Sequence, residues 1–274
     1  MRHAPDFAVM SQKFETILLS QRRQRRIRVA QAMGILVIVL LAFIAAGFFD
    51  FGRLSEGLPD LIDMIGQMFP PDFSNARNWL KPIFDTLAMS IAGTALAIAL
   101  SLPLALLAAK TTAPNRLLYQ GARLVLNILR AIPELIMGII FVAAVGFGVL
   151  PGVLAVGLHS VGMVGKFFAE SIEHADDAPI EAIQAVGADR FQVIYHGVLP
   201  QVLPQIVDVS LYRWEYNFRA STIMGAVGAG GIGFELIGAL RLLQYEAVGA
   251  ILMVILVMVA LVDGLSSLLR RHLA

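Results

Sequence analysis

The sequence predicts an all-α protein that crosses a membrane about six times. Of its 274 residues, 58% are hydrophobic and only 15% are charged, whereas a soluble domain carries about 25% charge. A soluble chain of this size must cover itself with polar atoms, so lipid has to solvate much of this surface. Each spanning helix needs about 20 apolar residues. The length therefore allows roughly six spans and leaves no room for an added soluble catalytic domain.

The first predicted span is residues 32–49, and it follows a basic segment, residues 1–31. The run contains no charged residue, and the positive-inside rule places the arginines before it in the cytoplasm. A cleaved signal peptide is the alternative, but its charged leader is unusually long and no A-x-A site follows. The arginines are Arg22, Arg23, Arg25, Arg26 and Arg28.

The second predicted span runs from Thr86 to Ala109 and contains no charge. Before it, residues 50–85 hold six acidic and only three basic residues. This balance is typical of an extracytoplasmic loop, because basic loops stay on the cytoplasmic side. Basic residues after Ala109 bring the chain back to the cytoplasm, and they are Lys110, Arg116, Arg123 and Arg130.

Residues 135–165 predict the third and fourth spans. These 31 residues contain no Asp, Glu, Lys or Arg, which is too long for one crossing and short for two. The glycine-rich stretch 146–152 is typical of a tight turn. We therefore expect two helices that extend into flanking residues, one from Arg123 onward and one past Lys166. Arg130 and Glu134 have the i,i+4 spacing of a helical ion pair.

The fifth span is predicted at residues 205–224, although hydropathy barely detects it. Residues 247–262 give the sixth span, and arginines in the tail, residues 269–274, end it. Because the basic residues at both ends favour the cytoplasm, the number of crossings must be even. The five spans that hydropathy detects clearly therefore require one more, the span at residues 205–224, and both termini then lie inside.

Residues 179–200 carry a recognisable pattern within the predicted core, residues 86–268. The pattern begins with Glu181 and Ala182, continues with a glycine and ends on Leu-Pro. It resembles the EAA loop of binding-protein-dependent ATP-binding-cassette importers. Two positions depart from that pattern, Ile183 in place of alanine and Gly197 in place of a large aliphatic residue. The positions that match or adjoin the motif are Glu181, Ala182, Gly187, Ala188, Leu199 and Pro200.

Further stretches are similar to permeases of phosphonate-type importers. They cover the chain from about residue 69 to its end, and comprise residues 69–73, 130–134, 211–215 and 219–233. The resemblance implies a type I importer core of five helices preceded by one extra helix, in a bacterial inner membrane. It also implies import of phosphonates or related anions, such as phosphite. No covalent chemistry is expected of such a subunit.

The resemblance further implies the partners and the coupling mechanism. Two cytoplasmic ATPase subunits, an extracytoplasmic binding protein and a second permease copy would complete the importer. The residues favour a short helix before Gly187 that fits a groove on a partner. The chain itself has no P-loop, because its last lysine, Lys166, precedes the glycine run. ATP is therefore expected on the partners, and no cofactor on this chain.

A polar stripe in the fifth span is the candidate substrate pathway. At 100° per residue its members fall within about 80° of arc, and charges at this depth must face protein or water. Glu215 and Arg219 have i,i+4 spacing, so a structural ion pair and a contact with an anionic substrate both stay open. The candidate residues are Asp208, Tyr212, Glu215, Arg219 and Thr222, with His159 of the fourth span added.

Two other functions compete with the importer. A proton-coupled secondary transporter would use His159, Asp208 and Glu215 as a relay, and internal repeats would mark it. An intramembrane enzyme would need a nucleophile or metal constellation, which the five scattered histidines do not form. No catalytic residue, metal site or nucleic-acid interface is predicted.

Overall fold

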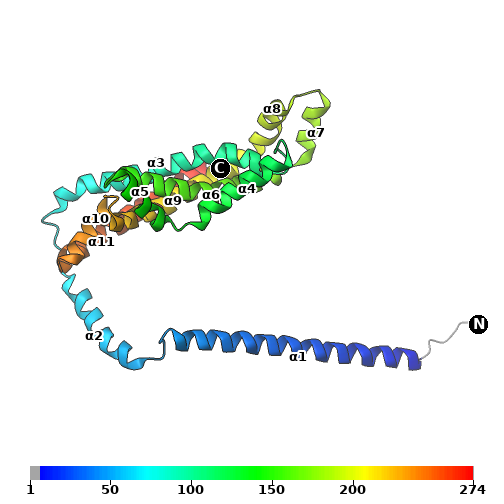
Figure 1. Cartoon of the computed structure of the whole chain (residues 1–274), viewed down its shortest axis with the longest axis horizontal. Coiled ribbons are helices and arrows are strands. Elements are labelled where there is room, and N and C mark those ends of the chain that lie inside the picture. Colours follow the sequence, from blue (N-terminus) through cyan, green and yellow to red (C-terminus); the bar gives the residue numbers. More distant parts are fainter. Residues whose placement is uncertain (1–6, 274) are drawn as a thin grey trace, which may run out of the picture. The chain divides into compact units, whose positions relative to one another are not determined.

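The computed structural model describes residues 7–273, and every element in that part of the chain is a helix. Helices α1 to α11 are coloured along the chain in Figure 1. The chain divides into two compact units, residues 1–64 and 65–274.

The first unit contains one long helix and most of a second. Helix α1 spans Phe7–Ala45, so the basic segment predicted before the first span continues that span as helix. Residues 24–45 of α1 are apolar enough to cross a membrane, and none of their most apolar window is buried against protein. Helix α2 spans Phe51–Gln67, so the predicted loop of residues 50–85 is largely helical. The start of α3 supplies its other helical part.

The second unit is a bundle built around α3 (Ala76–Ala108), α6 (Val149–Glu173) and α9 (Leu199–Met224). Figure 1 shows these three long helices running side by side. Glycines allow the closest approach of α3 and α6. A Cβ on Gly157 would lie 3.2 Å from the carbonyl oxygen of Gly93 and 2.9 Å from Leu96 Cδ2. Small residues at such crossings bring two backbones together where apolar burial cannot drive association.

The third predicted span is not one helix. Helix α4 covers Arg116–Ala131 and α5 covers Glu134–Val145, and the two are bent by 88° at the break between them. Ile132 is extended (φ −84°, ψ 121°) because the proline ring of Pro133 disfavours helical geometry in the residue before it. The expected i,i+4 pair of Arg130 and Glu134 is therefore wrong, since those residues lie on different helices.

The remaining helices complete the predicted spans. The turn expected within residues 146–152 is confirmed, with Gly146 and Gly148 at positive φ between α5 and α6. A 3-10 turn, Gly225–Val227, ends the fifth span, and α10 (Ile232–Arg241) follows with a bend of 45°. Helix α11 covers Tyr245–Leu273, so the predicted tail is its last turn. The described helices give four spans, or six when each bent pair counts as one.

Candidate functional site

One end of the bundle carries the candidate coupling segment. Helix α7 (Asp177–Ala185) and α8 (Arg190–Val193) project beyond the bundle in Figure 1, and a π-helical turn, Ile194–Val198, leads into α9. Gly187 has φ +84°, which an L side chain rarely adopts, so the reversal predicted after this helix is confirmed. Asp176 caps the start of the helix through its side chain, which accepts from the backbone N–H of Ala178, and Pro179 lies within the first turn.

The two departures from the EAA pattern lie against each other. The Cβ position of Gly197 is 3.4 Å from Ile183 Cδ1 and 3.5 Å from Ile180 Cα. A larger residue at 183 thus occupies space that a smaller residue at 197 leaves. This exchange of volume keeps α7 packed on the chain that enters α9, as core packing requires.

Hydrogen bonds close the coupling segment at its base. Gln201 accepts from the backbone N–H of Asp176 at 2.9 Å and donates to the carbonyl of Gly197 at 2.6 Å. Arg190 donates to the carbonyls of Thr112 and Ala113, both at 2.7 Å, and so joins α8 to the chain between α3 and α4. The segment is therefore fixed to the bundle by side chains as well as by its connections.

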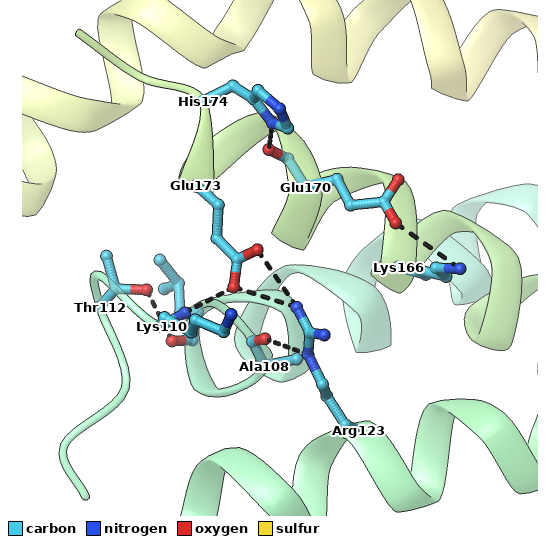
Figure 2. A network of polar contacts seen from close by, with 9 residues as sticks. Ala108, Lys110, Thr112, Arg123, Lys166, Glu170, Glu173 and His174 are labelled. Atoms are coloured by element: carbon cyan, nitrogen blue, oxygen red, sulfur yellow. Dashed lines mark hydrogen bonds and ion pairs between the residues drawn. The ribbon is translucent and has the colours of Figure 1, made fainter. Parts of the chain in front are cut away.

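Figure 2 shows how the end of α6, which leads into α7, is tied to the end of α3 and to α4. The carboxylate of Glu173 accepts from the backbone N–H of Lys110 at 2.8 Å and from the Arg123 guanidinium at 3.0 and 3.2 Å. Arg123 Nε donates to the carbonyl of Ala108 at 3.0 Å. Glu173 thus connects the end of α6 with the end of α3 and with α4.

The outer surface of the coupling segment is free of intrachain cover. Val186, Phe191 and Tyr195 are 83%, 84% and 64% exposed. Large apolar side chains grouped in this way mark a surface that binds a partner. Glu181, Ala182 and Gly187 are also exposed, and a cavity of about 710 Å³ lies behind them, lined in part by Glu181, Gln184, Ala188 and Arg190.

The polar stripe of α9 meets α11, and this corrects the expected pair of Glu215 and Arg219. Arg219 Nη1 lies 3.2 Å from Asp263 Oδ1, and Glu215 pairs with Arg270. Arg270 Nε is also 3.5 Å from Asp208 Oδ1. The i,i+4 pair does not form because α11 offers each side chain an opposite charge across the helix contact. These pairs join two helices.

The other stripe residues and His159 have separate surroundings. Tyr212 is 55% exposed, and the Thr222 hydroxyl donates to the Arg219 carbonyl at 2.6 Å. His159 Nδ1 lies 3.1 Å from the carbonyl oxygen of Ile132, at the break between α4 and α5. With its proton on Nδ1, the ring donates to a carbonyl that the break leaves without a helical partner. The structure thus does not gather the six candidate residues into one site.

A second polar group, which the sequence analysis did not single out, lies inside the bundle on the opposite side of α9. Arg213, Asn217 and Ser221 are 3% exposed or less. Their i,i+4 spacing was a signal in the sequence, and α3 repeats it with the buried residues Thr86, Ser90 and Thr94. Among the described residues, no three of His, Cys, Asp and Glu gather as metal ligands.

Residues 101–274 match the family described as "Binding-protein-dependent transport system inner membrane component". The chain belongs to this family. It is accordingly a multi-pass membrane permease of an ATP-binding-cassette importer and not an enzyme, and the proton-coupled alternative is not supported.

Individual relatives are also permeases of transport systems. This permease is 63% identical over 235 residues to the phosphite transport system permease protein of Stutzerimonas stutzeri, covering 86% of each chain. It is 42% identical to the phosphate-import permease protein of Mycolicibacterium smegmatis, over 80% of this chain and 41% of that protein. A chain of the inward-facing MetNI methionine ABC transporter shares its fold, with TM-score 0.61 and 22% identity over 72% of this chain and 96% of that one.

Proposed function

We propose that this permease imports phosphite, phosphonates or a related phosphorus oxyanion. The observation that carries the proposal is the 63% identity, over 86% of both chains, to a permease whose name gives phosphite as its cargo. The phosphate-import relative extends the cargo class to phosphorus oxyanions in general. Specificity within the class also depends on the binding protein that delivers the anion.

Reconstitution tests this substrate class. The permease is placed in proteoliposomes with its cognate ATPase and binding protein, and uptake and ATP turnover are measured with phosphite, methylphosphonate, phosphate and sulfate. We expect stimulation by at least one phosphorus anion and none by sulfate. If none of the phosphorus anions is taken up, the proposed substrate is wrong.

We also propose that the coupling segment is the surface on which an ATPase subunit docks. Its exposed apolar residues, Val186, Phe191 and Tyr195, flank a reversal at Gly187 that is tied to α9 and to the α3–α4 connection. A subunit that moved α7 and α8 would therefore pull on α3, α4 and α6 together through Arg190 and Glu173. Two ATPase copies, with ATP bound on them, would serve a pair of permease copies.

Substitution at Gly187 tests the docking. Gly187→Leu forces a side chain into φ +84°, which costs about 1 to 2 kcal/mol in the segment and alters the reversal. We expect the variant to insert normally but to lose co-purification with the ATPase. The matched control is Gly121→Leu on α4, where a Cβ meets nothing within 4 Å and φ is helical. Equal ATPase recovery from both variants would contradict docking through this reversal.

The proposed topology places residues 1–31, 179–200 and 269–274 in the cytoplasm and residues 50–85 outside. The charge bias of the sequence supports it, because the basic residues flank the spans on one side. Reporter fusions after Ala274 and at Asp189 are expected to report the cytoplasm, and a fusion at Asp63 the outside. A reporter at Asp189 that reads outside would separate the coupling segment from any cytoplasmic ATPase.

A further inference from the structure

A polar layer crosses the bundle near the middle of α3, α6 and α9. Asn217 Nδ2 donates to Thr94 Oγ1 at 2.9 Å, and the Ser160 hydroxyl lies 2.9 Å from Asn217 Oδ1. Arg213 Nε donates to Ser160 Oγ at 2.8 Å. All four side chains are at most 6% exposed. The layer therefore places a guanidinium inside the protein, among the long helices of the bundle.

Arg213 has only neutral neighbours in direct contact. Its Nη1 lies 3.3 Å from Met163 Sδ, and its guanidinium carbon lies 4.1 Å from the centre of the Tyr216 ring. Its Nη2 is buried and donates to no group of the described residues. Among the side chains that the structure describes, no ion pair includes Arg213. The positive charge is thus held by a hydroxyl, a thioether and an aromatic face.

A buried charge held in this way is a site for an anion. The acid that acts on Arg213 electrostatically is Glu134, which lies behind the Tyr216 ring and forms no ion pair with it. An ion without a directly bound counter-charge in a low-dielectric interior is costly, and an anion brought into contact with it recovers part of that cost. The planar fork of arginine suits the oxygens of a phosphorus oxyanion, which it binds through two parallel hydrogen bonds. The free Nη2 supplies donors for such a contact without breaking the bond to Ser160.

Tyr216 controls the approach to this guanidinium. Its ring covers Arg213 and is 36% exposed, so it lies between the buried charge and the surface of the bundle. Its hydroxyl is 3.4 Å from Glu134 Oε1, in the first turn of α5 after the bend. The other Glu134 oxygen is buried and has no hydrogen-bond partner among the described residues. A shift of α5 relative to α9 would carry Tyr216 off the guanidinium.

We propose that Arg213 is the anion-binding residue of the transport pathway and that Tyr216 is the movable cover over it. The proposal rests on the proposed function for its cargo, a phosphorus oxyanion. It moves the anion contact away from Arg219, whose charge Asp263 already neutralises. His159 lies near the same break but is engaged with the carbonyl of Ile132.

Anion-dependent thermal stability of the purified permease–ATPase complex tests the binding. Phosphite, methylphosphonate, sulfate and chloride are compared at millimolar concentration and equal ionic strength. We expect an oxyanion to raise the unfolding midpoint of the parent, and this shift to vanish in Arg213→Gln. The shift should persist in Arg219→Gln, the matched loss of a charge on the same helix. Where Arg213→Gln is poorly recovered, Arg213→Lys keeps the charge without the fork and should weaken anion binding at least about tenfold.

Uptake by proteoliposomes separates this proposal from the proposed function. Retained oxyanion stabilisation in Arg213→Gln, or no oxyanion stabilisation of the parent, overturns the role of Arg213 even where the parent transports phosphite. A parent that transports no phosphorus anion, but loses its oxyanion stabilisation in Arg213→Gln, overturns the proposed cargo and supports the site. Tyr216→Ala should strengthen anion binding because it removes the cover, whereas Tyr216→Phe keeps the ring and should resemble the parent.

Discussion

The two sides of α9 hold charge in opposite ways. Toward α11, Glu215 and Arg219 each find an opposite charge, on Arg270 and Asp263. On its other side, Arg213 contacts Ser160, Met163 and an aromatic ring and forms no ion pair with a described side chain, although Glu134 acts on it from behind that ring. On the first side, each of these charges forms an ion pair within the protein. On the second side, the charge of Arg213 forms no ion pair and can bind an anion. A charged residue in a spanning helix is thus informative about function only when its partner is known.

The largest effect on the paired side should come from Arg270, because two carboxylates depend on it. Arg270→Gln leaves Glu215, whose side chain is only 13% exposed, without a counter-charge. Breaking a buried pair in this way costs about 3 kcal/mol in the free energy of unfolding. Thermal unfolding in detergent measures the loss, and adding Glu215→Gln should restore much of it. Arg271→Gln, the exposed neighbour, is the control and should change little.

A smaller effect is expected within the polar layer on the other side. Asn217→Ala removes the donor to Thr94 and the acceptor near Ser160, and Asn217 is fully buried. Loss of these bonds costs about 2 kcal/mol in the free energy of unfolding. The same substitution at exposed Asn127 on α4 is the control. Equal unfolding midpoints for the two variants would mean that the layer contributes nothing to stability.

The smallest effect should follow Arg219→Gln. Arg219 and Asp263 are 44% and 43% exposed, so solvent or lipid headgroups can compensate either charge. An exposed pair contributes about 0.5 kcal/mol. We expect near-parental abundance and uptake, and a double variant with Asp263→Asn that behaves like the single one. A loss of uptake at normal abundance would return Arg219 to the anion pathway and weaken the contrast between the two sides.

Hydropathy and charge bias predicted the spanning helices, because an apolar run of about 20 residues is visible in the sequence. Helices α2 and α10 were not predicted, because neither is such a run. The bend at Pro133 was missed because the third span was extended back to Arg123 to reach a membrane-spanning length, although the proline was a signal for a helix end. The ion pairs between α9 and α11 could not be predicted from the sequence either. The i,i+4 rule sees only partners on the same helix, so it joined Glu215 to Arg219 and left Arg270 as a flanking charge.

The coupling segment was predictable because its pattern is local. The glycine at the reversal and the short helix before it follow from residue type, and the motif added the connection to α9. The site around Arg213 depends instead on which side of α9 faces the bundle. Both sides carry polar residues, so periodicity alone did not decide between them.

The contact between Ile183 and Gly197 sets a rule for building hybrid transporters. The two positions form one packing unit, although 13 residues separate them along the chain. A graft that brings only the α7 sequence of a relative with alanine at 183 would open a void over Gly197. A graft that brings only a large residue at 197 would clash with Ile183. We therefore expect the coupling segment of this permease to be exchangeable only as a whole, from the cap of α7 to the start of α9.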